Sequence, residues 1–115
     1  KSYTEAVSRY TQALEKTPYE VPLLTNISIA FGKIGSWQDS LEFCNRTIHL
    51  DKSHTKVLYH RCKAHISLNL LDKALLDINR CVELDPGQSI FLKHRLKLNQ
   101  QIETEHLEKI LFDTS

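Results

Sequence analysis

The most reactive side chains in this chain belong to its three cysteines and six histidines. Thiolates and imidazoles bind zinc when they occur in closely spaced pairs. No Cys-x-x-Cys spacing occurs, and the histidines of the central segment have no cysteine four residues away on the same helical face: His54, His60 and His65. We therefore expect no metal and no other cofactor, and we expect the cysteines to pack as small, buried apolar side chains.

The patterns that accompany catalysis are also missing from the sequence. It contains no glycine-rich phosphate loop, no Gly-x-Ser-x-Gly nucleophile motif and no pair of carboxylates placed to share a cleft. We therefore predict that this segment is not an enzyme.

One basic cluster, Lys93-His94-Arg95 followed by Lys97, invites comparison with a nucleic-acid site. No aromatic side chains alternate with it to stack on bases, and the formal net charge of the chain is only +1. A charge this small favours neither nucleic acid nor a lipid surface as a partner. No apolar run approaches the roughly 20 residues that span a bilayer. We expect this cluster to form a solvated helix face.

Cysteine usage bears on the compartment. Cys44, Cys62 and Cys81 are odd in number and widely separated, which argues against a disulfide framework and favours a reducing compartment. We expect the cytoplasm, with the nucleus as the alternative. The chain opens at Lys1 and contains no methionine, which favours a fragment or a processed product.

The elements that position these side chains are helices, because the chain has only three glycines and three prolines and its apolar residues recur at helical spacings. Breaks are expected at Pro18, Gly35, Asn69 and Pro86. Ser36 and Ser89 are candidate N-caps of the helices that follow them. The predicted helices span residues 3–16, 21–34, 37–50, 55–68, 71–84 and 90–112.

The strongest pattern is an internal repeat at a constant spacing. Ala6, Ser40 and Ala74 are small residues in one register, and Ala13, Thr47 and Cys81 are small residues in another. A fixed period of about 34 residues indicates stacked helical hairpins, and small side chains are needed where the helices of a pair cross closely. We predict an all-α solenoid, a class of fold that binds partners along extended grooves.

Both end helices carry a specific expectation. We expect the last helix to present its apolar residues to the preceding pair on one side, namely Leu92, Leu96, Leu98, Ile102, Leu107 and Ile110. The opening helix, Tyr3 to Lys16, lacks a preceding partner, so part of its apolar side should be open to water. An upstream segment or formation of a homo-oligomer would cover that side.

These features resemble the tetratricopeptide repeat (TPR) family over residues 1 to about 86. The segment from Asn69 to Leu75, continued by Val82 to Pro86, looks like the second half of a standard unit. The resemblance implies one domain of about 2.5 repeats. It comprises the second helix of a truncated repeat (1–18), two further repeats (20–52 and 54–86) and a C-terminal capping helix (89–112).

A finer resemblance is to the TPR domains of co-chaperones, immunophilin-like proteins among them, which bind the acidic C-terminal tails of the ninety- and seventy-kilodalton heat-shock chaperones. Their third repeat typically begins Lys-x-x-x-Arg. In those domains a set of lysine, asparagine and arginine side chains, called the carboxylate clamp, binds the acidic tail. Here Lys56 matches a clamp lysine, and His60 stands in place of the clamp arginine. Asn26 matches a clamp asparagine of the second repeat. The other lysine and asparagine of that clamp belong to a helix outside this sequence.

The resemblance implies a peptide-binding groove along the first helix of each repeat, with Lys33 and Lys63 on the same inner register as Asn26, Lys56 and His60. A lysine offers a point charge to a carboxylate and an asparagine offers two N–H donors. A histidine offers a charged donor only when it is protonated, so we expect affinity for an acidic tail to be weaker than with arginine, or to rise on acidification.

Three alternatives stay open at this stage. Arg61 could replace His60 in the clamp, although it lies ~100° around the helix from Lys56. The groove could instead hold a fixed partner of a scaffold without carboxylate recognition. The segment could also accompany a catalytic domain elsewhere in its protein, such as a prolyl isomerase ahead of the repeats.

Overall fold

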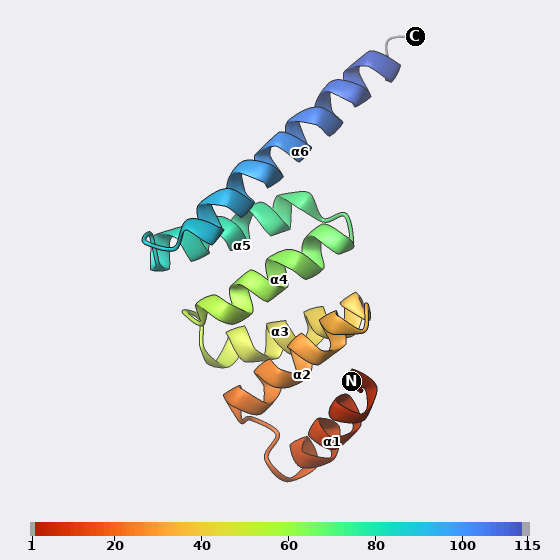
Figure 1. Ribbon diagram of the computed structural model, residues 1–115, viewed down its shortest axis with the longest axis vertical. Helices are drawn as coiled ribbons and strands as arrows, with labels where there is room; N and C mark the ends of the chain where they lie inside the picture. The colour runs from red at the N-terminus through yellow and green to blue at the C-terminus, as the bar shows by residue number, and fades with distance from the viewer. Residues whose placement is uncertain (1, 114–115) are drawn as a thin grey trace.

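A computed structural model describes residues 2–113, which form six helices and no strand (Figure 1). The predicted all-α class is confirmed, and each predicted helix end lies within one residue of the observed end. The helices are α1 (Tyr3–Lys16), α2 (Val21–Lys33), α3 (Trp37–Leu50), α4 (Thr55–Ser67), α5 (Leu71–Leu84) and α6 (Ser89–Asp113).

Left-handed residues separate the helices of each hairpin. Gly35 follows α2 with a φ of 77°, and Asn69 follows α4 with a φ of 59°, in agreement with the residue types that tolerate this conformation. Ser36 is the N-cap residue of α3, as predicted, but it makes no capping hydrogen bond to the helix backbone, and the predicted cap at Ser89 is wrong. The hydroxyl of Ser36 donates to the carboxylate of Asp39 at 2.7 Å instead of accepting from the helix backbone, and Ser89 is itself the first residue of α6.

The hairpins stack into an elongated body of 56 × 32 × 25 Å. Helices α2 and α3 pack most closely together, as do α4 and α5, while α1, α3 and α5 each also contact the helix that follows. Figure 1 shows this order as a continuous stack from α1 to α6. The predicted solenoid of helical hairpins is therefore confirmed.

Small residues of the repeat register permit the close crossings. Ser28 and Ser40 are fully buried, and the Ser40 hydroxyl donates to the Ser28 carbonyl at 2.7 Å, joining α3 to α2. One repeat later Cys62 and Ala74 hold the equivalent positions, both buried. The backbones approach closely because none of these side chains extends far beyond its β-carbon.

One repeat position is filled by two different chemistries. Phe31 and Phe43 stack with ring centroids 5.6 Å apart between α2 and α3. One repeat later the same positions are His65 and Asp77, whose Nδ1 and Oδ2 atoms lie 2.8 Å apart. An aromatic contact in one hairpin is thus replaced by a buried polar contact in the next.

The structure corrects the expected packing of α6. Phe91 and Leu98 are its buried residues, and Ile102 is half-buried. Four of the residues expected to face the preceding pair are exposed instead: Leu92, Leu96, Leu107 and Ile110. Leu92 and Leu96 lie on other sides of the helix from Leu98. Leu107 and Ile110 lie in the part of α6 that extends past α5. Helix α5 has 14 residues and α6 has 25, so α5 covers only the first part of α6.

The opening helix has no fully buried residue. Val7, Tyr10 and Leu14 are half-buried against α2, while Tyr3 remains 42% exposed. An incompletely covered apolar side is what the sequence predicted for this helix.

Candidate functional site

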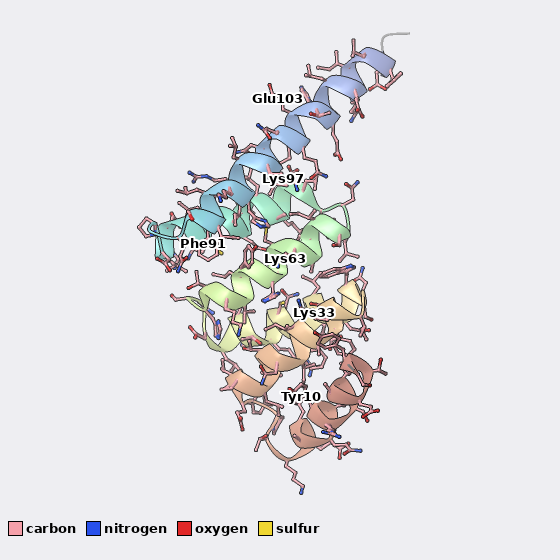
Figure 2. All side chains as sticks on the ribbon, viewed as in Figure 1. Tyr10, Lys33, Lys63, Phe91, Lys97 and Glu103 are labelled. Atoms are coloured by element: carbon pink, nitrogen blue, oxygen red, sulfur yellow. The ribbon has the colours of Figure 1, made fainter. Side chains whose placement is uncertain are left out.

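A row of lysines crosses three helices that do not follow one another in sequence. Lys33 belongs to α2, Lys63 to α4 and Lys97 to α6, and Figure 2 shows the three along one line down the stack. Lys33 and Lys63 line the same small cavity of about 60 Å³, together with His60. Ile29, Gly32 and Trp37 complete its wall. Three of the five predicted site residues are therefore brought together.

The other two predicted residues share the faces that carry this cavity. Asn26 precedes Ile29 and Lys33 by three and seven residues on α2, and Lys56 precedes His60 and Lys63 by four and seven residues on α4. These spacings place the members of each set on one helical face. Asn26 and Lys56 are both exposed, so their polar ends are open to a ligand.

His60 is neutral in this environment. Burial lowers the pKa of His60 to about 4, and the nearby charges of Lys63, Lys56 and Lys33 contribute to that lowering in this order of effect. Two of these lysines, Lys33 and Lys63, line the same cavity as the imidazole. The pKa of His60 in the unliganded domain therefore lies below the ordinary histidine range.

Arg61 is engaged elsewhere. Its Nε and Nη2 atoms donate to the carboxylate of Asp77, the shortest contact being 2.7 Å, and its Nη1 donates to Asn45 at 3.1 Å. These partners belong to α5 and α3. The alternative in which Arg61 replaces His60 in the clamp is therefore wrong, because its guanidinium is committed to the packing between hairpins.

The sequence did not predict that the groove continues onto α6. A second cavity, of about 380 Å³, shares Trp37 and Lys63 with the first and adds residues of α6. Its α6 residues are His94, Lys97, Leu98 and Gln101. Lys97 is exposed, as expected for a solvated face, and it also borders this cavity, whereas His94 is half-buried. The signal was present, since His94 follows His60 by one repeat period, and Lys97 follows Lys63 by the same interval.

Tyr59 joins α4 to this part of α6. Its hydroxyl lies 2.7 Å from Nε2 of His94, and Nζ of Lys63 lies 4.6 Å from its ring centroid. Burial and then the charges of Lys63 and Lys97 lower the pKa of His94. Tyr59 therefore orients a lysine and a histidine that both line the second cavity.

The cysteines are buried and free, as the sequence indicated. Burial raises the pKa of Cys44 and Cys81 to about 11 and that of Cys62 to about 12. Because thiolates are the nucleophilic and metal-binding form, these thiols are suited to packing. Within residues 2–113, no helix combines the length and the apolarity needed to cross a membrane.

A larger cavity lies away from the lysine row. It has a volume of about 590 Å³ and lies between the α1–α2 turn and α3, where Tyr19, Leu24 and Leu50 give it an apolar wall. The ion pair of Glu42 and Arg46 also lies along it. None of the five predicted site residues lines this cavity.

Comparison with known proteins finds relatives that are much longer than this chain. No family model matches the chain. Sperm-associated antigen 1 of Homo sapiens is 29% identical over 87 residues, which cover 76% of this chain and 9% of that protein. Protein unc-45 homolog B of Mus musculus is 31% identical over 108 residues, which cover 91% of this chain and 12% of that protein. The chain spans less than a sixth of the length of the curated relatives it matches.

Solved structures of TPR domains share the fold of this chain. The first TPR of Spaghetti (RPAP3), bound to the HSP90 peptide SRMEEVD, has a TM-score of 0.84 at 29% identity and covers 88% of this chain and 80% of its own. The second TPR domain of human RPAP3, in complex with the HSP70 peptide SGPTIEEVD, has a TM-score of 0.79 at 26% identity, with coverages of 84% and 81%. Together with the repeated hairpins, these likenesses show that the chain is a tetratricopeptide repeat domain that resembles the TPR domains of co-chaperones.

Proposed function

We propose that this domain binds the acidic C-terminal tail of a heat-shock chaperone in the groove formed by α2 and α4. The binding residues are Asn26, Lys33, Lys56, His60 and Lys63. The observation that carries the proposal is that Lys33, His60 and Lys63 line one cavity, while Asn26 and Lys56 are exposed on the same helices, α2 and α4. The two similar domains with bound peptides support it, since both peptides end in Glu-Glu-Val-Asp.

Charge complementarity explains why an acidic ligand fits. Three lysines that together lower the pKa of His60 also repel one another in the unliganded domain. A carboxylate bound between them relieves that repulsion. Lys56 is exposed at the first turn of α4 and supplies a charge to the ligand, while the amide of Asn26 on the neighbouring helix donates hydrogen bonds. The buried free cysteines favour a reducing compartment, so we place this interaction in the cytoplasm or nucleus.

A titration with the peptide Ser-Arg-Met-Glu-Glu-Val-Asp tests this proposal. We expect Lys56→Glu to weaken binding by about tenfold or more, because an attraction to the ligand carboxylates becomes a repulsion. Lys73→Glu is the matched control: it makes the same charge change in the first turn of α5, at a cavity that shares no residue with the groove. Equal affinities for the Lys56→Glu and Lys73→Glu variants would show that Lys56 does not contact the ligand.

The second candidate function is a scaffold module whose groove holds a fixed partner without recognising carboxylates. The half-buried Trp37 and Ile29 in the cavity wall favour it, because they offer apolar surface. Added salt separates the two functions, since the screening length falls from about 10 Å at 0.1 M to about 3 Å at 1 M. Binding by lysines should weaken steeply over this range, whereas binding by apolar contacts should not.

A further inference from the structure

The repeat register makes α6 a counterpart of α2 and α4. Asn26, His60 and His94 succeed one another at intervals of one repeat period, and Ile29, Lys63 and Lys97 form the next set in the same register. In α2 and α4 these two positions belong to the face that carries the groove. In α6 they line the second cavity. The first half of α6 therefore repeats the groove-facing pattern of the helices before it.

The two cavities adjoin each other, and together they are called the trough. Trp37 and Lys63 line both of them, so the two cavities lie next to each other between Lys33 on α2 and Lys97 on α6. Figure 2 shows Lys33, Lys63 and Lys97 in this order along the stack. The α6 residues of the trough lie outside the set of five residues proposed to bind the terminal acidic residues of a peptide.

The α6 end of the trough combines an apolar floor with a basic rim. Leu98 is 2% exposed, and Trp37 and Ile66 are half-buried beside it. Lys63 and Lys97 are the charged residues at this cavity, and neither cavity of the trough has an acidic residue in its wall. Such a surface suits an apolar side chain with a carboxylate next to it.

The trough face carries basic side chains, whereas the rest of the chain has an excess of acidic ones. Four of the chain's fifteen lysine and arginine side chains belong to the trough face, namely Lys33, Lys56, Lys63 and Lys97, which leaves eleven against fourteen acidic side chains elsewhere. The basic trough therefore lies on a domain that is otherwise net acidic. An anionic segment that extends along the trough gains attraction over its whole length.

We propose that α6 is a third ligand-binding helix, and that Lys97 together with Lys63 binds an acidic side chain upstream of the terminal acidic residues of the peptide. An apolar side chain beside that acidic residue packs on Trp37 and Leu98. The direction follows from the clamp: because Asn26 and Lys56 hold the end of the peptide, only preceding residues extend to α6. This inference rests on the proposed peptide-binding function, and it makes the ligand longer than four residues.

Binding of designed peptides tests this inference. The short probe is Glu-Glu-Val-Asp. The long probes add a glycine–serine segment that carries one Glu-Leu pair two, three, four or five residues before the first glutamate, and the long control has glycine and serine alone. We expect at least one long probe to bind about fivefold more tightly than the long control, in line with an ion pair and a partly buried leucine.

Variants then assign that gain. Lys97→Glu should remove the gain of the best long probe and weaken the short probe less than Lys56→Glu does, because Lys97 lies outside the five residues proposed to bind the short probe. Lys73→Glu should leave the gain intact. The inference is wrong if no long probe exceeds the long control, or if Lys97→Glu and Lys73→Glu lose the gain equally.

The outcome separates this inference from the proposed function. Loss of short-probe binding in Lys56→Glu, with no specific effect of Lys97→Glu, overturns the role of α6 alone. Failure of the wild-type domain to bind the short probe or any long probe overturns the proposed function and the role of α6 together. Circular dichroism of the Lys97→Glu variant should match the wild type, since the Lys97 side chain is exposed.

Discussion

Replacing Asp77 by alanine should lower the free energy of unfolding by about 3–5 kcal/mol, the cost of breaking a buried ion pair from one side. Asp77 is 2% exposed, and its carboxylate accepts hydrogen bonds from Arg61 and lies 2.8 Å from Nδ1 of His65, which is 6% exposed. The alanine variant leaves the buried His65 and the partly exposed Arg61 without this acceptor. Urea denaturation followed by circular dichroism measures the loss.

Two further variants make this prediction specific. Glu83→Ala removes an exposed acidic side chain of the same helix that pairs with Arg80, and it should cost less than about 1 kcal/mol because exposed pairs contribute little. The triple variant Arg61→Ile/His65→Phe/Asp77→Phe copies Ile27, Phe31 and Phe43 of the preceding repeat. We expect it to recover much of the stability, since apolar replacements of buried ion networks are often neutral. A loss below about 1 kcal/mol in Asp77→Ala would contradict the structural role of this network.

The second large effect concerns His60, where arginine should increase affinity for an acidic C-terminal peptide by about tenfold at pH 7. A guanidinium donates two parallel hydrogen bonds to a carboxylate and keeps its charge. The His60 imidazole instead has a pKa of about 4, lowered by burial and by three lysines, and is therefore neutral at pH 7. Isothermal titration calorimetry of the wild type and the His60→Arg variant with the same peptide measures the gain.

The affinity of the wild type should depend on pH, and that of the His60→Arg variant should not. A bound carboxylate raises the pKa of His60 above its value of about 4 in the unliganded domain. Binding then takes up a proton, so wild-type affinity should rise as the pH falls from 7 towards 5. Below about pH 4 the carboxylates of the peptide themselves become protonated. In His60→Arg and in His60→Gln the rise should be absent; a wild-type affinity that falls between pH 7 and 5 would contradict this coupling.

The fold could be predicted from the sequence because residues of similar size recur at the same position of each repeat. Small residues such as Ser40 and Ala74 recur once in every repeat period, and they are the residues that the structure buries where helices cross. Turn residues such as Gly35 and Asn69 adopt the left-handed conformation that their types permit. Local sequence and global packing agree at these positions, so the helix boundaries were predicted to within one residue.

The details that could not be predicted depend on side-chain partners distant in sequence. Arg61 and Asp77 are sixteen residues apart, and nothing in their local spacing shows that they form a buried pair. The pKa of His60 depends on Lys33 of another helix. On α6, apolar residues occur on several sides of the helix, so periodicity alone did not distinguish the buried Phe91 and Leu98 from the exposed Leu92 and Leu96.

The most direct test of the peptide-binding groove is to map the binding site of Ser-Arg-Met-Glu-Glu-Val-Asp on the uniformly nitrogen-15-labelled domain by NMR. We predict that the largest amide shift changes occur on α2 and α4 around Asn26, Lys33, Lys56, His60 and Lys63, and that amidation of the peptide C-terminus reduces them. The amides of Tyr19, Arg46 and Leu50, at the larger cavity beside α1, should remain unchanged. Shift changes concentrated at that larger cavity, or none at all at millimolar peptide, would contradict the proposed groove.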